Sequence, residues 1–201
     1  MYPMMFDPMY MVMILPAFLL ALYAQMKVKS TFARFSSVYA SRGCSADSVS
    51  RMLLDRFGLQ NVRVERIAGN LTDHYDPRSK ILRLSDSVGG SSSIAAIGVA
   101  AHEVGHAVQD LQNYAPLKIR NSLVPVAGLG SNLGMVLFFV GLVMRTGFLV
   151  TFGVILFSCA VLFQIVTLPV EFDASRRALA LLSETGTLTS GELSGARSVL
   201  S

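Results

Sequence analysis

Charged residues are scarce in this chain. Asp, Glu, Lys and Arg together make up 15% of its 201 residues, whereas 52% are hydrophobic. An ordinary soluble domain carries about 25% charged residues. The composition therefore argues against a soluble domain and indicates an integral membrane protein. The sequence also has no internal repeat and no low-complexity tract, which sets repeat arrays aside.

Cysteine is scarce too. The chain has two cysteines, of which Cys44 lies in a polar segment and Cys159 lies midway along an apolar run. This is not a Cys-rich zinc pattern. We expect no disulfide between them and interpret both as small, buried or inert thiols.

A nucleic-acid-binding pattern is also absent. The net charge is +4, but the basic residues flank apolar runs and form no stripe with interleaved aromatic residues. That distribution argues against a nucleic acid partner and favours contact with a lipid bilayer.

Three apolar segments approach or exceed the roughly 20 residues that cross a bilayer core. Their approximate bounds are Met9 to Ala24, Leu123 to Met144 and Gly147 to Val170. Arg145 and Thr146 alone separate the last two, so we expect a tight helical hairpin. The spacing of Gly130 and Gly134 favours close contact between helices.

The basic residues lie mostly on one side of these spans. They follow the first span, precede the second and follow the third, and they include Lys27, Lys29, Arg34, Arg42, Lys118, Arg120, Arg176 and Arg177. Only Arg145 lies on the other side. The positive-inside rule then places the N-terminus outside, and it places residues 26–120 and the tail after about residue 170 in the cytoplasm.

The predicted fold class is an α+β membrane protein, mostly helical, with three transmembrane helices and a small cytoplasmic subdomain that contains a short β-sheet. We expect four parts. They are a transmembrane helix (1–25), the cytoplasmic subdomain (26–120), a transmembrane helical hairpin (121–170) and a cytoplasmic helical tail (171–201).

The pattern within residues 26–120 alternates between helical and strand periodicity. Helices are predicted from Ser45 to Phe57 and from about Ile94 to Leu111, the second after a serine cap. Strands are predicted from Asn61 to Ile67, from Leu71 to Tyr75 and from Ile81 to Leu84. The last strand precedes the second helix, so we expect its edge to be offered to an extended substrate.

The most informative segment is Ala101–Ala107, which reads AHEVGHA and contains an H-E-x-x-H motif. His102 and His106 are four residues apart, so on a helix their side chains lie on one face, one turn apart. Two imidazoles so placed can bind one Zn²⁺, and Glu103 can act as general base on the water that zinc activates. The surrounding stretch is apolar, where unpaired His and Glu would be costly to bury.

A hydrolytic zinc site takes three protein ligands and leaves one position for water. His74 and Glu171 are the candidates for the third ligand. We favour Glu171, because it stands at the inner end of the third span, where a carboxylate is costly without a partner. It also opens a helix predicted from Glu171 to Leu182, whose N-terminal dipoles favour negative charge.

Two nearby residues are predicted to assist. His74 would stabilise a transition-state oxyanion or contact substrate, and the alternative is a surface histidine in a turn. Asp173 would accept a hydrogen bond from a ligand imidazole, and the alternative is an acid at a helix start. The alternative for Glu171 is an interfacial acid that meets water or pairs with arginine.

Five stretches carry a family resemblance. They are GNLTDHYDPR, ILRLS, AAHEVGHAVQ, YAPLKIR and LPVEFDASRRAL. Together they resemble the YugP-like family of bacterial membrane zinc metallopeptidases, and the match runs through nearly the whole chain. The resemblance implies a neutral zinc endopeptidase with His102, His106 and a downstream acid at the metal, so the cytoplasmic subdomain (26–120) is expected to be a zincin-like metallopeptidase subdomain.

The stretch EFDAS also resembles the E-F-x-A-D pattern of the membrane gluzincins, which include the prenyl-protein endopeptidases. There the first Glu is the third zinc ligand, which maps onto Glu171. Ser175 stands where that pattern has Asp, so the role of that Asp does not carry over. Asp173 is the nearest alternative acid.

The expected function is a zinc-dependent endopeptidase in a bacterial inner membrane, with its site on the cytoplasmic face and peptides or membrane proteins as substrates. The main alternative is a membrane scaffold or adaptor with a structural zinc closed by four ligands, and a transporter is a weaker one. Family members usually continue into another apolar segment, so we expect a fourth span after Ser201. Nothing in the sequence sets the oligomeric state.

Overall fold

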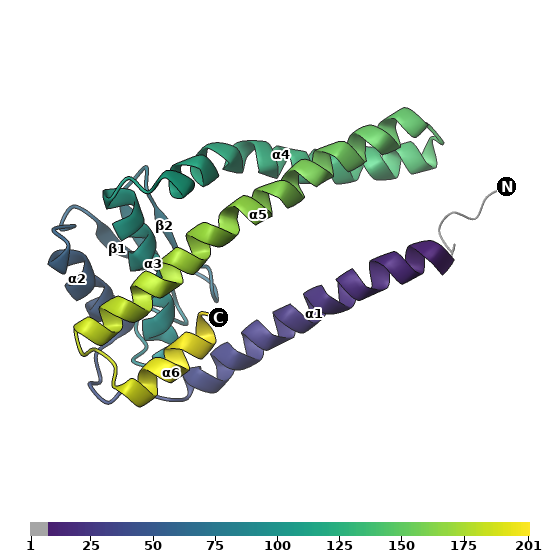
Figure 1. The fold of residues 1–201 in the computed structure, drawn as a ribbon. Coiled ribbons are helices and arrows are strands. Elements are labelled where there is room, and N and C mark those ends of the chain that lie inside the picture. Colours follow the sequence, from purple (N-terminus) through teal and green to yellow (C-terminus); the bar gives the residue numbers. More distant parts are fainter. Residues whose placement is uncertain (1–7) are drawn as a thin grey trace.

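A computed structural model of the chain describes residues 8–201, and it describes residues 8–14, 17 and 126 by their backbone only. Two long arms extend from one side of a globular unit (Figure 1). The helices are α1 (Pro8–Ser36), α2 (Ala46–Arg56), α3 (Ile94–Leu111), α4 (Ala115–Val143), α5 (Gly147–Glu184) and α6 (Ser190–Val199). The strands are β1 (Arg63–Ile67), β2 (His74–Asp76) and β3 (Ile81–Ser85).

Serine caps fix the starts of the two helices predicted in the globular unit. The side chain of Ser45 accepts a hydrogen bond from the Ser48 N–H at the start of α2, and Ser93 does the same for Ala96 at the start of α3. Such caps satisfy N–H groups that have no partner within the helix. The predictions of both helices are confirmed, and α3 has the predicted bounds.

The three strands form one small sheet in the order β1-β3-β2, in which β1 is parallel and β2 antiparallel to β3. The sequence prediction of three strands is confirmed, although β2 is shorter and begins later than expected. The prediction that Ile81 to Leu84 offers a free edge is wrong. This strand is β3, and both of its edges are already paired, with β1 and with β2. The edge strand next to Glu103 of α3 is β2.

Helix α3 runs through the centre of the globular unit. Its small side chains leave room for neighbours on every side, and it contacts α1, α2, α5, α6 and the sheet. Ala100, Ala101 and Val104 are fully buried within a core that also contains Leu82 and Leu182. The Ala-rich sequence of α3 is therefore explained by close packing of backbones around it.

Helices α4 and α5 pack along each other as the hairpin predicted from the sequence (Figure 1). A Cβ added at Gly134 would lie 2.9 Å from the Gly153 carbonyl oxygen, which is closer than real Cβ contacts allow. The prediction of close helix contact at Gly134 is confirmed. Helix α5 also continues without a break through residue 171. The prediction that a helix begins at Glu171 is therefore wrong, and Glu171 lies in the interior of a helix, where no free N-terminal N–H groups favour its charge.

Within the described residues, two helices, α4 and α5, are long and apolar enough to cross a membrane. The prediction of three spans is corrected to two candidates. The first predicted span, from about Met9 to Ala24, lies in α1, and several of its side chains lie outside the described residues. Residues 1–7, at the start of that predicted part, lie outside the described residues.

The two cysteines lie apart and are both free. The absence of a disulfide between Cys44 and Cys159 agrees with the prediction. Of the two expected states, buried or inert, burial is wrong for both residues, because both are exposed. Cys159 faces outward from the apolar hairpin rather than into its packed seam.

Candidate metal centre

Helix α3 carries the three residues of the H-E-x-x-H motif on one turn. The rings of His102 and His106 have centroids 4.7 Å apart and stand nearly perpendicular, at 85°. His106 and Glu103 are buried, whereas His102 is half-buried. The one-turn spacing thus places two imidazoles side by side at the surface of the helix, as the sequence predicted.

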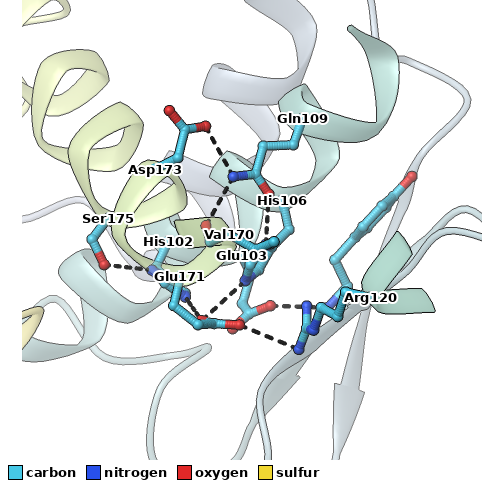
Figure 2. Close-up of polar contacts among 10 residues, drawn as sticks. His102, Glu103, His106, Gln109, Arg120, Val170, Glu171, Asp173 and Ser175 are labelled. Carbon is cyan, nitrogen blue, oxygen red and sulfur yellow. Dashed lines mark hydrogen bonds and ion pairs between the residues drawn. The ribbon is translucent and has the colours of Figure 1, made fainter. Parts of the chain in front are cut away.

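Helix α5 brings a carboxylate to these imidazoles. The Oε2 atom of Glu171 lies 3.1 Å from Nε2 of His102 and 3.5 Å from Nε2 of His106 (Figure 2). One ligand atom from each of the three residues lies within 4.8 Å of the others. Residues 69 positions apart in sequence, His102 and Glu171, therefore meet in one cluster.

The cluster fits a zinc ion. Zinc binds imidazole nitrogen at about 2.0–2.1 Å in a tetrahedron, which places neighbouring ligand atoms about 3.3 Å apart. The observed separations of 3.1 and 3.5 Å between the Glu171 oxygen and the two imidazole nitrogens bracket that value. Two imidazoles and one carboxylate are also the donor set of many catalytic zinc sites.

A buried amide fixes the orientation of His106. The Nε2 atom of Gln109 donates hydrogen bonds to the Val170 carbonyl and to Asp173, both at 2.9 Å. The Gln109 Oε1 atom is therefore the group that faces Nδ1 of His106, at 3.0 Å (Figure 2). An acceptor there requires the proton on Nδ1, which leaves the lone pair on Nε2 for a metal.

Asp173 acts on the cluster through this amide. The sequence analysis predicted a direct hydrogen bond from a ligand imidazole to Asp173, but Gln109 stands between them. Arg176 and Arg177 hold the same carboxylate from the following turn of α5. Asp173 thus ties α3 to α5, and it contacts no ligand directly.

Ser175 orients the other imidazole. Its hydroxyl lies 3.0 Å from Nδ1 of His102, on the side of the ring away from Glu171 (Figure 2). Sequence reasoning passed over this serine because the related pattern has Asp at its position. It also passed over Gln109, although its place three residues after His106 puts it on the same helix face.

Arg120, near the start of α4, pairs with the outer oxygen of Glu171. Its Nη2 atom lies 3.3 Å from Oε1, which leaves Oε2 turned toward the histidines. Burial alone lowers the pKa of His106, but the carboxylates of Glu171 and Glu103 outweigh burial and raise that pKa above its ordinary value. The two carboxylates therefore favour a positive charge at His106.

Glu103 points toward the edge strand of the sheet. Its Oε2 atom accepts a hydrogen bond of 2.9 Å from the backbone N–H of Tyr75 on β2. The Tyr75 hydroxyl donates to Asp110, farther along α3, at 2.7 Å. Burial, and then the Asp110 carboxylate, raise the pKa of this phenol above its ordinary value, so Tyr75 acts as a neutral anchor of β2 on α3.

His74 lies outside the cluster. Its Nδ1 atom is 2.9 Å from the Thr72 carbonyl, and its Nε2 atom is 3.3 Å from Nη1 of Arg83. The cluster brings together His102, His106 and Glu171. Of the two candidates for the third ligand, the structure therefore places Glu171, and not His74, beside the imidazoles.

Gly105 sets the distance between the two helices that carry the cluster. A Cβ at this position would lie 2.6 Å from the backbone oxygen of Ala174 on α5, and a backbone atom cannot move aside alone. We expect Gly105→Ala to destabilise the fold by about 1–3 kcal/mol. It should also weaken zinc binding, because the added methyl group moves α5, and with it Glu171, away from the histidines on α3. Circular dichroism melting and zinc titration measure the two effects.

The matched control for this variant lies on the same helix. A Cβ at Gly98 would meet Ala196 at an ordinary 3.6 Å, so Gly98→Ala should keep both stability and zinc affinity. Equal behaviour of the two variants would contradict the role of Gly105 as a spacer.

The fold and the site together define a class. An H-E-x-x-H helix that receives a glutamate from a second helix has the ligand arrangement of a zinc metallopeptidase, here attached to two long apolar helices. The chain belongs to the family described as "Putative neutral zinc metallopeptidase", whose profile matches residues 10–201. The family predicted from the sequence is thereby confirmed.

The chain is also similar to a curated bacterial protein. It is 44% identical over 182 residues to "Putative membrane protease YugP" of Bacillus subtilis (strain 168), covering 90% of this chain and 81% of that protein. No solved structure matches the chain.

Proposed function

We propose that this chain is a zinc-dependent endopeptidase that hydrolyses peptide bonds at the cytoplasmic face of a bacterial inner membrane. The observation that carries the proposal is the convergence of His102, His106 and Glu171, with a second carboxylate, Glu103, on the same helix turn. Membership of a family described as zinc metallopeptidases, and a relative named a membrane protease, support the same reaction and setting.

Zinc would be held by His102, His106 and Glu171, and when bound it supplies a Lewis acid that polarises the scissile carbonyl and makes water more acidic. Gln109 and Ser175 hold the Nδ1 sides of the two imidazoles, so that both Nε2 atoms face the Glu171 carboxylate and would be free to bind the ion. Arg120 holds the outer oxygen of Glu171 and so keeps the inner oxygen on the histidines.

Glu103 is the general base of this proposal. Its carboxylate takes a proton from the attacking water and passes it to the leaving amine, as a base within one hydrogen bond of the reacting atoms does. The Tyr75 N–H keeps Glu103 at the edge of the sheet. An extended peptide would lie along β2, the edge strand nearest to Glu103, by adding its backbone to the sheet.

The proposed membrane arrangement has the two candidate spans, α4 and α5, as a helical hairpin. Lys118 and Arg120 near the start of α4, and Arg176 and Arg177 near the end of α5, lie at the end of the hairpin next to the globular unit. Lys27, Lys29 and Arg34 lie at the corresponding end of α1. Basic residues concentrate on the cytoplasmic side, so the metal cluster would face the cytoplasm.

A structural zinc site in a scaffold protein would need a fourth protein ligand. His74 was the residue expected to supply it, and within the described residues its ring is held by Thr72 and Arg83 instead. The three-donor cluster thus supports the catalytic form of the site over the structural one.

Removal of zinc tests the proposal directly. We expect the purified chain in detergent to cleave an unfolded protein substrate, to lose this activity after dialysis against a chelator, and to regain it on addition of about one zinc per chain. Quantitative metal analysis and gel-based cleavage measure the two quantities together. Cleavage that persists at zero zinc would contradict a metallopeptidase.

A further inference from the structure

A pocket of about 290 Å³ adjoins the metal cluster. His102 and Glu171 form part of its wall, and Val28, Val99, Phe172 and Leu200 form another part. These apolar side chains come from the helices α1, α3 and α5 and from the residue that follows α6. A peptide whose scissile bond lies at the cluster would therefore have a neighbouring side chain within reach of this pocket.

The pocket is sized for a single side chain. Ligand pockets that enclose whole small molecules have volumes of about 300–1,000 Å³, so a pocket of about 290 Å³ lies just below that range. No lysine, arginine or aspartate is among the lining residues, and the one carboxylate, Glu171, is already paired with Arg120 and the histidines. A charged substrate side chain would find no unpaired opposite charge among these lining residues, whereas an apolar side chain would bury its surface against the apolar ones.

The open side of the pocket lies between the two arms of the molecule. Val28 on α1 is 55% exposed and Phe172 on α5 is 67% exposed, so these two side chains form a rim and not a closed wall. Helices α1 and α5 leave the globular unit on the same side (Figure 1). Both carry large exposed apolar residues along their length, among them Phe18, Leu19, Leu22, Leu162, Ile165 and Leu168.

We propose that this pocket selects a bulky apolar side chain next to the scissile bond. The inference rests on the proposed function and gives it a substrate class, namely peptides cut beside a residue such as Leu or Phe. A substrate with a membrane-inserted segment has such apolar residues at the end of that segment. These residues would lie level with the pocket, where α1 and α5 join the globular unit. Val99 is the specificity-determining residue, because it forms the pocket wall three residues before His102 on the same helix.

The test uses four Ala-rich octapeptides labelled with fluorescein. They differ only at one central residue, which is Leu in the first, Phe in the second, Ala in the third and Lys in the fourth. We expect the zinc-loaded full chain to cleave the Leu and Phe peptides with a kcat/KM at least about tenfold above that of the Ala and Lys peptides, since a few methylenes in an apolar pocket give 10–200-fold discrimination. Val99→Phe should remove this preference while keeping about one zinc per chain.

A second variant covers the case in which Val99→Phe does not fold. Val28→Phe adds the same bulk at the exposed rim, where no core packing is disturbed, and should reduce the same preference. Met26→Phe lies on the same helix, is 55% exposed and does not line the pocket, so it is the matched control and should leave the preference unchanged.

Binding without turnover separates this inference from the proposed function. Fluorescence anisotropy of the same peptides with Glu103→Gln protein should show the same order of affinities, and adding Val99→Phe should abolish it. If the wild-type chain cleaves no peptide but binding shows this pattern, hydrolysis is refuted and the pocket assignment stands. If all four peptides are cleaved equally, or if Val99→Phe leaves the preference intact, the pocket assignment is overturned and hydrolysis stands.

Discussion

We expect Glu103→Gln to reduce kcat/KM for peptide cleavage by about 10²–10⁴-fold, the usual contribution of a positioned general base, and to retain about one zinc per chain. The amide has nearly the same shape as the carboxylate but cannot accept a proton from water. Its oxygen can still accept the Tyr75 N–H that now binds Glu103, so the fold around the cluster should be preserved.

The control for this variant is Glu184→Gln, at the exposed end of α5, which should have full activity. The cleavage rate and the zinc content are measured on the same preparation. A low rate with about one zinc per chain indicates loss of the base, and a low rate with little zinc indicates loss of the metal. Full activity of Glu103→Gln would remove Glu103 from the mechanism.

We expect Glu171→Ala to lose zinc as well as activity. The change removes the one carboxylate ligand and leaves Arg120 without its partner, so a positive charge then faces the two imidazoles. The loss of zinc affinity should exceed the 10–100-fold that removal of a residue behind the ligands causes. Competition with a fluorescent zinc chelator measures the affinity of each variant.

Glu184→Ala is the matched control, because it truncates an exposed glutamate on the same helix. It should bind zinc as the wild type does. Wild-type affinity in Glu171→Ala would mean that another residue completes the site.

The elements of the globular unit could be predicted from local patterns. Serine caps marked the starts of α2 and α3, and the spacing of His102 and His106 required a common helix face. Glu171 could be singled out because a carboxylate at the end of an apolar run needs a partner. Each of these three inferences used only residues that are close together in the sequence, and the structure agrees with each of them.

The order of the strands could not be predicted in this way. β3 pairs with β1 in parallel and with β2 in antiparallel fashion, and the parallel pairing depends on contacts between segments that no turn joins directly. Placing the free edge on β3 was therefore wrong. The substrate path moves to β2, where Tyr75 contacts Glu103.

The supports of the imidazoles were also beyond the sequence. Gln109 connects His106 to Val170 and Asp173, which are 61 and 64 residues away. Ser175 reaches His102 across 73 residues. Such contacts follow from the close approach of α3 and α5 at Gly105, and the distance between two helices is set by their whole interface and not by any one motif.

The central claim is that two imidazoles and one carboxylate bind a single zinc. Zinc X-ray absorption spectroscopy of the purified full-length chain tests this claim most directly. The account predicts a four-coordinate zinc with two imidazoles and only oxygen otherwise, at about 2.0–2.2 Å, with the imidazole signal retained and the zinc affinity lost in Glu171→Ala. A third imidazole, or sulfur at about 2.3 Å, would contradict it.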